Sequence, residues 1–250
     1  MIATSLSCGA PASAVEPRTS GRAAGTELQA QPPTSTTIAV PEYRAVVDDI
    51  AAAREALARE LAAASTPEGR ASVLTRARAR LERAIVDELT PRWMGTPWAM
   101  NGVSTEPGEG AIACGYFVAT ILQDAGFRLR RVRFGQAAAL RIQEATTPPR
   151  RAVHRFLSIP PEALAERVAA LGDGVYIIGL NVHVGFVVVR GGDVRFVHSS
   201  YTGARVVVDE PLATARAIEL SQPSGYFVSE LISTDEAITR WLGGAALSLP

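Results

Sequence analysis

Cysteine and histidine, the residue types best suited to nucleophilic catalysis, are rare in this chain of 250 residues, which has two cysteines and three histidines. Cys114 lies in "EGAIACGYFVAT", where a glycine-rich loop gives way to an apolar helical pattern. In the first turn of a helix, unpaired backbone N–H groups and the helix dipole favour a thiolate. The same N–H groups can stabilise an oxyanion. Cys114 is therefore a candidate nucleophile, and such a residue also requires a base.

The alternative for Cys114 is an inert, packed thiol. Apolar residues follow it at the i+3, i+4, i+7, i+8 and i+11 positions: Phe117, Val118, Ile121, Leu122 and Ala125. These positions form one helical stripe, and free cysteine is among the residue types most often buried. Both interpretations predict a helix over 113–125 that is ended by Gly126.

Two of the three histidines are predicted to share one face of a β-hairpin. In "VHVGFVVVRGGDVRFVHSS", the pair Gly191-Gly192 is typical of a two-residue hairpin turn. Counting back from that turn places His183 opposite Ser200, with His198 one diagonal step away on the same face. Diagonal neighbours are about 7–8 Å apart, a distance that two imidazole rings can bridge. We expect His183 to act as the base for Cys114 and His198 to orient it.

The elements that must position these residues predict an α+β fold, with helices first and an antiparallel sheet afterwards. A helical hairpin is expected, with one helix over 41–65 and a second that starts at Thr66-Pro67 and is ended by Pro91. Further helices are expected over 136–145 and 161–171, and "RLRRVRF" (128–134) is expected to be an edge strand or an extended segment. Five short β-branched or aromatic runs predict strands over 174–180, 182–189, 193–200, 204–210 and 225–233.

Composition divides the chain into three parts. Residues 1–38 are rich in Ala, Ser, Thr, Gly and Pro, which predicts a disordered tether. Residues 39–90 form the helical hairpin, and 91–250 form the domain that carries Cys114 and the histidines. The hairpin either regulates the cleft or belongs to the fold proper, packing against the back of the central helix. In "SLSCGA", Cys8 is either the lipidated cysteine of a lipoprotein signal or part of a small-residue tail.

Charge and spacing exclude several classes of function. The formal net charge is zero, which argues against a nucleic-acid binder. No apolar run approaches the roughly 20 residues of a membrane-spanning helix. The cysteines and histidines do not cluster at ligand spacing, so neither a metal nor another cofactor is expected.

The order of the motifs resembles that of NlpC-type cysteine peptidases, a branch of the papain-like superfamily. Those proteins have G-T-P-Y-x-x-G-G, a short loop, D-C-S-G and an apolar helix, then H-V-G-I-Y, a hairpin and I-H-A-S-S. This chain has "GTPWAMNG", "VSTEPGEGAIA" and "CGYFV", then "HVGFVV", "RGGD" and "FVHSS", over about residues 92 to 208.

The resemblance implies a papain-like fold, in which the helix that bears the cysteine packs on an antiparallel sheet. It implies Cys114 as nucleophile, His183 as base and His198 as the third polar residue. Trp98 stands where the family has a cleft tyrosine, and Asn101, Gly115 and Ser200 are the other expected substrate contacts.

The chain also departs from the family pattern. Ala113 and Gly115 flank Cys114 where the family has Asp and Ser, and Asn101 replaces the first glycine of the pair. Because that Asp is associated with a free amino terminus on the substrate, we expect a divergent specificity.

These observations lead to one principal expectation and two alternatives. The first is an extracytoplasmic thiol hydrolase that cleaves an amide or isopeptide bond through a thioester, in a peptide such as the peptidoglycan stem peptide. The second is a papain-like amidase, deamidase or acyltransferase that acts on another substrate. The third is a catalytically idle binding module of the cell envelope.

Overall fold

The computed structural model describes residues 40–147 and 153–250, and these belong to one compact unit. The tether predicted over 1–38, with Cys8, lies outside the described residues. The longer helices are α1 (Val40–Ala63), α2 (Pro67–Arg83), α4 (Cys114–Asp124), α6 (Ala139–Thr146), α7 (Pro161–Ala169) and α9 (Asp235–Leu242). The shorter helical segments are the π turn η1 (Ala84–Leu89), α3 (Thr90–Trp93), α5 (Arg131–Gly135), η2 (Leu212–Thr214), α8 (Arg216–Ser221) and η3 (Gln222–Ser224).

The described strands form one antiparallel sheet. They are β1 (His154–Phe156), β2 (Gly174–Gly179), β3 (Val184–Arg190), β4 (Asp193–Ser199), β5 (Val207–Pro211) and β6 (Tyr226–Glu230). Their order across the sheet is β1-β6-β2-β3-β4-β5. The last strand in the sequence therefore inserts between β1 and β2, while β2 to β5 follow one another as hairpins. The predicted α+β class with an antiparallel sheet is confirmed.

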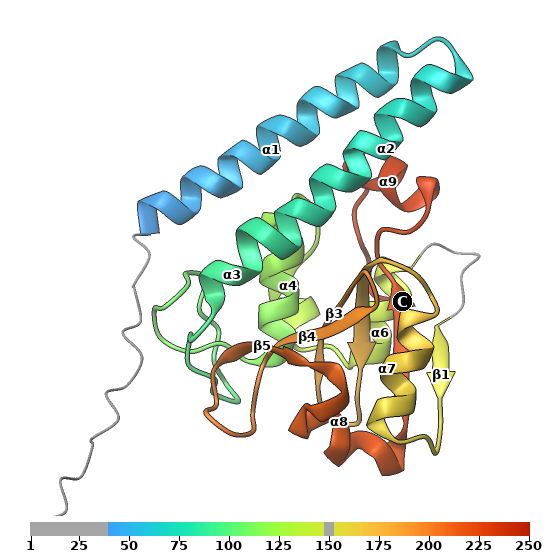
Figure 1. Cartoon of the computed structure of the whole chain (residues 1–250). Coiled ribbons are helices and arrows are strands. Elements are labelled where there is room, and N and C mark those ends of the chain that lie inside the picture. The colour runs from blue at the N-terminus through green and yellow to red at the C-terminus, as the bar shows by residue number, and fades with distance from the viewer. Residues whose placement is uncertain (1–39, 148–152) are drawn as a thin grey trace, which may run out of the picture. The chain divides into compact units, whose positions relative to one another are not determined.

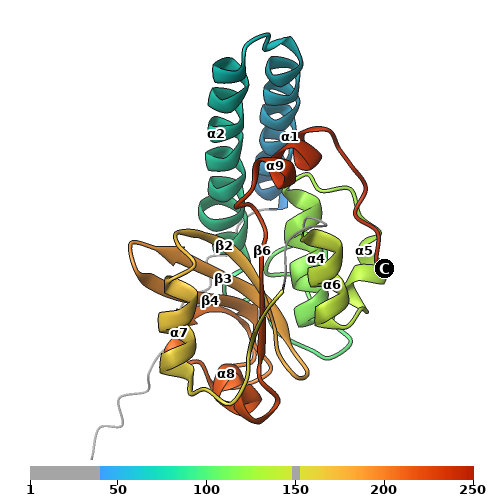
Figure 2. The ribbon, with the colours of Figure 1, turned by 90° about the vertical axis from the view of Figure 1, so that its right-hand side faces the viewer.

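Helices cover both faces of this sheet (Figures 1 and 2). On one face, Ile177, Phe186 and Val197 pack against α4 and the helical hairpin. On the other face, the side chains of β2, β3 and β6 pack against α7 and the η2–α8 segment. Because both faces are covered, β2 and β3 consist of almost continuous apolar residues.

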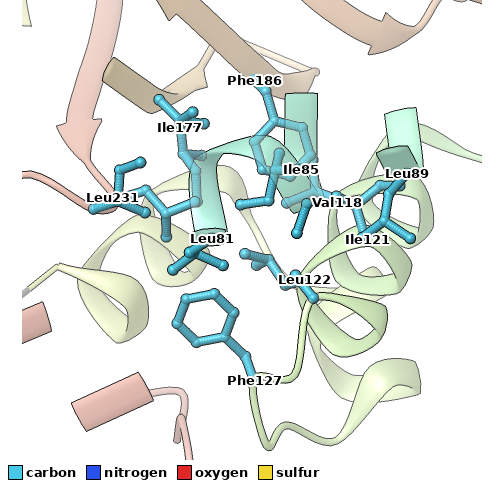
Figure 3. Close-up of a cluster of buried hydrophobic side chains, with 14 of the residues drawn as sticks. Leu81, Ile85, Leu89, Val118, Ile121, Leu122, Phe127, Ile177, Phe186 and Leu231 are labelled. Carbon is cyan, nitrogen blue, oxygen red and sulfur yellow. The ribbon is translucent and has the colours of Figure 1, made fainter. Parts of the chain in front are cut away.

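The hairpin of α1 and α2 packs into the same core as α4. Thr66 caps α2, since its Oγ1 accepts a hydrogen bond of 3.0 Å from the Gly69 N–H, as the sequence predicts. Figure 3 shows side chains from α2, η1, α4 and the sheet meeting in one buried cluster, among them Leu81, Ile85, Leu89, Val118, Ile121, Leu122, Ile177 and Phe186. The hairpin is thus part of the fold proper, one of the two arrangements expected.

A buried polar chain connects the hairpin to α4. The Tyr43 hydroxyl donates to Asp124 Oδ2 at 2.6 Å and accepts from Trp93 Nε1 at 2.9 Å. Burial raises the pKa of the Asp124 carboxyl, even though the bond from Tyr43 lowers it. The base of the hairpin and the end of α4 therefore share one buried polar contact.

One local prediction is wrong, and another holds only in part. Pro91 does not end the helical region, because the π turn η1 places it in the first turn of α3, where its missing N–H is not needed. The segment 128–134 is extended only at its start, where Arg128 forms a parallel bridge with Ala246, and it does not continue as a strand because α5 begins at Arg131. The Arg131 guanidinium donates to Thr120 Oγ1 at 2.7 Å and lies over the Tyr116 ring, so tertiary contacts override the alternating pattern.

In the part of the chain that the structure describes, no helix is both long enough and apolar enough to cross a membrane.

Candidate active site

Cys114 is the first residue of α4, and the segment before it is fixed to the sheet. The Ser199 hydroxyl of β4 donates to the Ile112 carbonyl at 2.6 Å, and the Ala113 N–H donates to the Gly102 carbonyl at 2.9 Å. A Cβ on Gly102 would lie 2.7 Å from the backbone of Ala111, so only glycine allows this approach. The helix predicted over 113–125 is confirmed as Cys114–Asp124, and Gly126 follows it with a positive φ.

The Cys114 thiol lines a cleft of about 270 Å³ together with His183. Burial raises the pKa of the thiol, although the backbone N–H groups of Val184, Gly115 and Cys114 itself lower it. Because burial is the larger effect, the resting thiol is protonated at neutral pH. Cys114 is nevertheless only partly buried, unlike the apolar residues that follow it on the same stripe.

The two histidines are in contact. His183 directly precedes β3 and His198 is on β4, in the register set by the predicted turn at Gly191-Gly192. His183 Nε2 lies 2.7 Å from His198 Nδ1. Gly185 permits this packing, because a Cβ there would be 2.8 Å from His198 Cβ. The sheet register therefore positions the pair as the sequence predicts.

Glu210 extends the pair into a chain of three residues, and sequence reasoning did not include it in the site. His198 Nε2 lies 2.9 Å from Glu210 Oε1. Glu210 is on β5 opposite Phe196, which places it on the same face as His198. Side chains alternate between the two faces of the sheet along β5. This alternation could have assigned Glu210 to the face of His198 only if the β4–β5 register were known.

The hydrogen bonds assign the histidine tautomers. An ionised carboxylate only accepts, so His198 Nε2 carries a proton and donates it to Glu210. A neutral His198 then accepts at Nδ1, so His183 Nε2 must be the donor. The lone pair of His183 is therefore on Nδ1. That atom is buried and has no hydrogen-bond partner among the described residues.

Burial keeps both histidines neutral. It lowers the pKa of His183 well below its usual value, and the neighbouring His198 lowers it further. Burial also lowers the pKa of His198, while Glu210 opposes this shift. The resting site thus combines a neutral thiol with a neutral imidazole, and His183 Nδ1 has its proton-accepting capacity free.

Aromatic side chains surround the histidine pair. The Tyr201 ring meets the His183 ring edge to face at 5.1 Å, and the Trp98 ring lies 6.3 Å from Tyr201. Burial raises the pKa of Tyr201, and the nearby Cys114 contributes to the shift. Arg205 lies over Trp98 at 4.6 Å. Trp98 therefore lies in the neighbourhood of the candidate site, and Tyr201 is a residue that sequence reasoning missed.

Of the remaining predicted substrate contacts, only Gly115 lies in the cleft, which it lines with Cys114. Asn101 is an exposed turn residue that does not line the cleft. The Ser200 hydroxyl bonds to Thr202 within the β4–β5 loop, at 3.0 Å from its Oγ1. Within 40–147 and 153–250, no group of three or more Cys, His, Asp or Glu side chains is placed to hold a metal ion.

No protein-family model matches this chain, and the comparisons with curated proteins and with solved structures also give no match. The resemblance to NlpC-type peptidases therefore depends on the sequence motifs alone.

Proposed function

We propose that this protein is a thiol-dependent hydrolase that cleaves an amide or isopeptide bond through a thioester intermediate, as a divergent NlpC-type enzyme would. One observation carries the proposal. A cysteine at a helix start shares a cleft with a histidine whose Nδ1 is unprotonated and unpartnered among the described residues, and whose Nε2 is held by His198 and Glu210.

In the first step, Cys114 Sγ attacks the substrate carbonyl carbon while His183 Nδ1 accepts the thiol proton. The C–N bond then breaks, and His183 returns that proton to the leaving nitrogen. This leaves the acyl group bound to sulfur as a thioester. General-base transfer of this kind suits a neutral thiol and a neutral imidazole, since no ion pair need exist before the substrate binds.

In the second step, water attacks the thioester carbonyl and His183 accepts a proton from that water. The C–S bond breaks, the carboxylic acid leaves, and the sulfur recovers a proton from His183. Glu210 stabilises the imidazolium that forms transiently in each step, because its carboxylate accepts from His198, which in turn accepts from His183. Backbone N–H groups at the start of α4 are suited to the oxyanion.

The histidine chain also bears on the idle-module alternative. Buried polar atoms without a partner destabilise a fold, by about 1–3 kcal/mol each. A hydrolase requires the Nδ1 of His183 to be free to accept a proton, which fits its lack of a partner among the described residues, but Tyr226 and Ser229 also have unpartnered buried oxygens, so this feature alone does not separate the two alternatives.

The test uses the full chain with Cys8→Ser, so that Cys114 is the remaining thiol, and peptidoglycan stem peptides together with simpler peptide amides as substrates. Reaction in ¹⁸O-labelled water should place one label in the acid product, and Cys114→Ala should abolish turnover without changing the fold. An added amine that captures the acyl group in place of water would indicate the acyltransferase alternative. Unchanged turnover by Cys114→Ala would refute the mechanism.

A further inference from the structure

The chemistry of the cleft beside Cys114 restricts what it can bind. One wall is the segment 135–139, "GQAAA", which joins α5 to α6, and the other is 180–184, which joins β2 to β3. Among the described residues that line the cleft, none has a charged side chain. We propose that the cleft binds an uncharged peptide segment of the substrate, with small or apolar side chains. This inference rests on the proposed function, because it takes the cleft as the place where substrate reaches Cys114.

Two carboxamides are positioned to bind peptide groups. Gln136 and Asn181 lie on opposite walls, and both are exposed. Neither side chain makes a hydrogen bond to another described residue. A carboxamide donates and accepts at once, which matches the donor and acceptor of a peptide group. These two side chains therefore fit the backbone of a substrate rather than a hydrocarbon chain.

The other lining side chains are small or apolar. Residues 137–139 are alanines, and Val182 is 71% exposed at the rim, where it has no apolar cover. The base of the cleft is tightly packed, because a Cβ on Gly115 would lie 2.4 Å from the Gly135 carbonyl oxygen. The surface open to a substrate side chain is thus formed mainly by methyl groups.

The electrostatics of the cleft predict an order of preference among neutral, acidic and basic substrate side chains. A carboxylate or ammonium group that enters the cleft loses water and gains no opposite charge, which is unfavourable. Both α4 and α6 begin at this cleft without side-chain caps, at Ala113 and Ala138. Their partial positive charge favours a carbonyl oxygen and opposes a cation most strongly. The expected order of preference is neutral, then acidic, then basic.

The experiment measures covalent labelling of Cys114 by peptidyl ketone electrophiles that carry Ala, Glu or Lys next to the reactive carbonyl. The protein is the full chain with Cys8→Ser, and intact mass gives the rate after correction for the reactivity of each reagent with a free thiol. We expect the Ala reagent to label at least about tenfold faster than the Lys reagent, with the Glu reagent between them, because the cleft offers no opposite charge. Equal or faster labelling by either charged reagent would overturn the inference.

Variants at the exposed rim provide a matched test. Val182→Glu should increase labelling by the Lys reagent, and Val182→Lys should increase labelling by the Glu reagent. Val132→Glu is the control, because Val132 is 56% exposed but does not line the cleft, so the order should not change. If the Val182 variants leave the order unchanged, the substrate does not occupy this cleft. Failure of all three reagents to label Cys114 would instead refute the proposed function.

Discussion

His198 lies between His183 and Glu210, with one ring nitrogen 2.7 Å from His183 Nε2 and the other 2.9 Å from Glu210 Oε1. This arrangement makes Glu210 the residue that decides which nitrogen of His183 is protonated. A side chain two hydrogen bonds from the candidate base therefore sets the base's tautomer.

Replacing Glu210 with Gln should lower kcat about 10- to 100-fold, by analogy with the loss of a carboxylate that orients a metal-bound histidine. The carboxamide can donate to His198 as well as accept, which admits the tautomer with a proton on His183 Nδ1. Nitrogen chemical shifts of the two imidazoles report the tautomer directly. Asp209→Asn is the matched control, because that neighbouring carboxylate pairs with Arg195 instead. If Glu210→Gln keeps full activity and the same shifts, Glu210 has no positioning role.

Alkylation of Cys114 by iodoacetamide should be slow at neutral pH. Burial raises the pKa of the thiol, so the reactive thiolate forms at higher pH than in a free cysteine, whose pKa is about 8.5. In the Cys8→Ser protein the rate should still be rising at pH 9. A rate that levels off below pH 7 would indicate a preformed thiolate–imidazolium pair and contradict the neutral resting site.

Acid should destabilise the fold through the buried histidines. Burial lowers the pKa of His183 and His198 in the folded state, so the unfolded chain binds more protons once the pH falls below about 6.5. The free energy of unfolding is therefore unaffected by these histidines above that pH. It decreases as the pH falls below it, by at most about 1.4 kcal/mol per pH unit for each histidine. Urea unfolding between pH 5 and 8 measures this slope. His183→Gln should reduce it, and an unchanged slope would show that His183 is protonated equally in both states.

Two buried tyrosines should respond oppositely to loss of the hydroxyl group. Tyr43→Phe leaves Asp124 and Trp93 without their shared partner and should cost about 1–3 kcal/mol of unfolding free energy. Tyr226 is equally buried, but its hydroxyl has no hydrogen-bond partner in the described chain. Tyr226→Phe should thus be neutral or stabilising. Urea unfolding measures the free energy of both variants. If the two lose the same amount, the buried polar chain does not stabilise the contact between the hairpin and α4.

Local signals in the sequence were sufficient for much of the architecture. The cap at Thr66, the helix over 113–125 and the turn at Gly191-Gly192 each depend on residues that are close in the chain. The histidine pair followed from the turn, because a two-residue hairpin has one register.

Features that depend on distant contacts could not be predicted. Glu210 reaches His198 only because the loop after Ser200 sets the β4–β5 register, and nothing in the sequence defines that loop's geometry. The segment 128–134 has the alternation of a strand, yet Arg131 bonds to Thr120 on α4, and this contact favours a helical turn. Pro91 is accommodated within the helical region because a π turn precedes it, and such a turn has no local sequence signature.

Adjacent residues of β4 hold the two halves of the candidate site. The His198 ring reaches His183 on one side of the sheet, and the Ser199 hydroxyl on the other side holds the carbonyl of Ile112, two residues before Cys114. Because one strand makes both contacts, we expect a displacement of β4 to move the start of α4 and the imidazole pair together. The distance between the Cys114 sulfur and the His183 ring should then change little when the sheet fluctuates. We therefore expect reactivity to persist under mild destabilisation of the domain, which would inactivate a site assembled from independent loops.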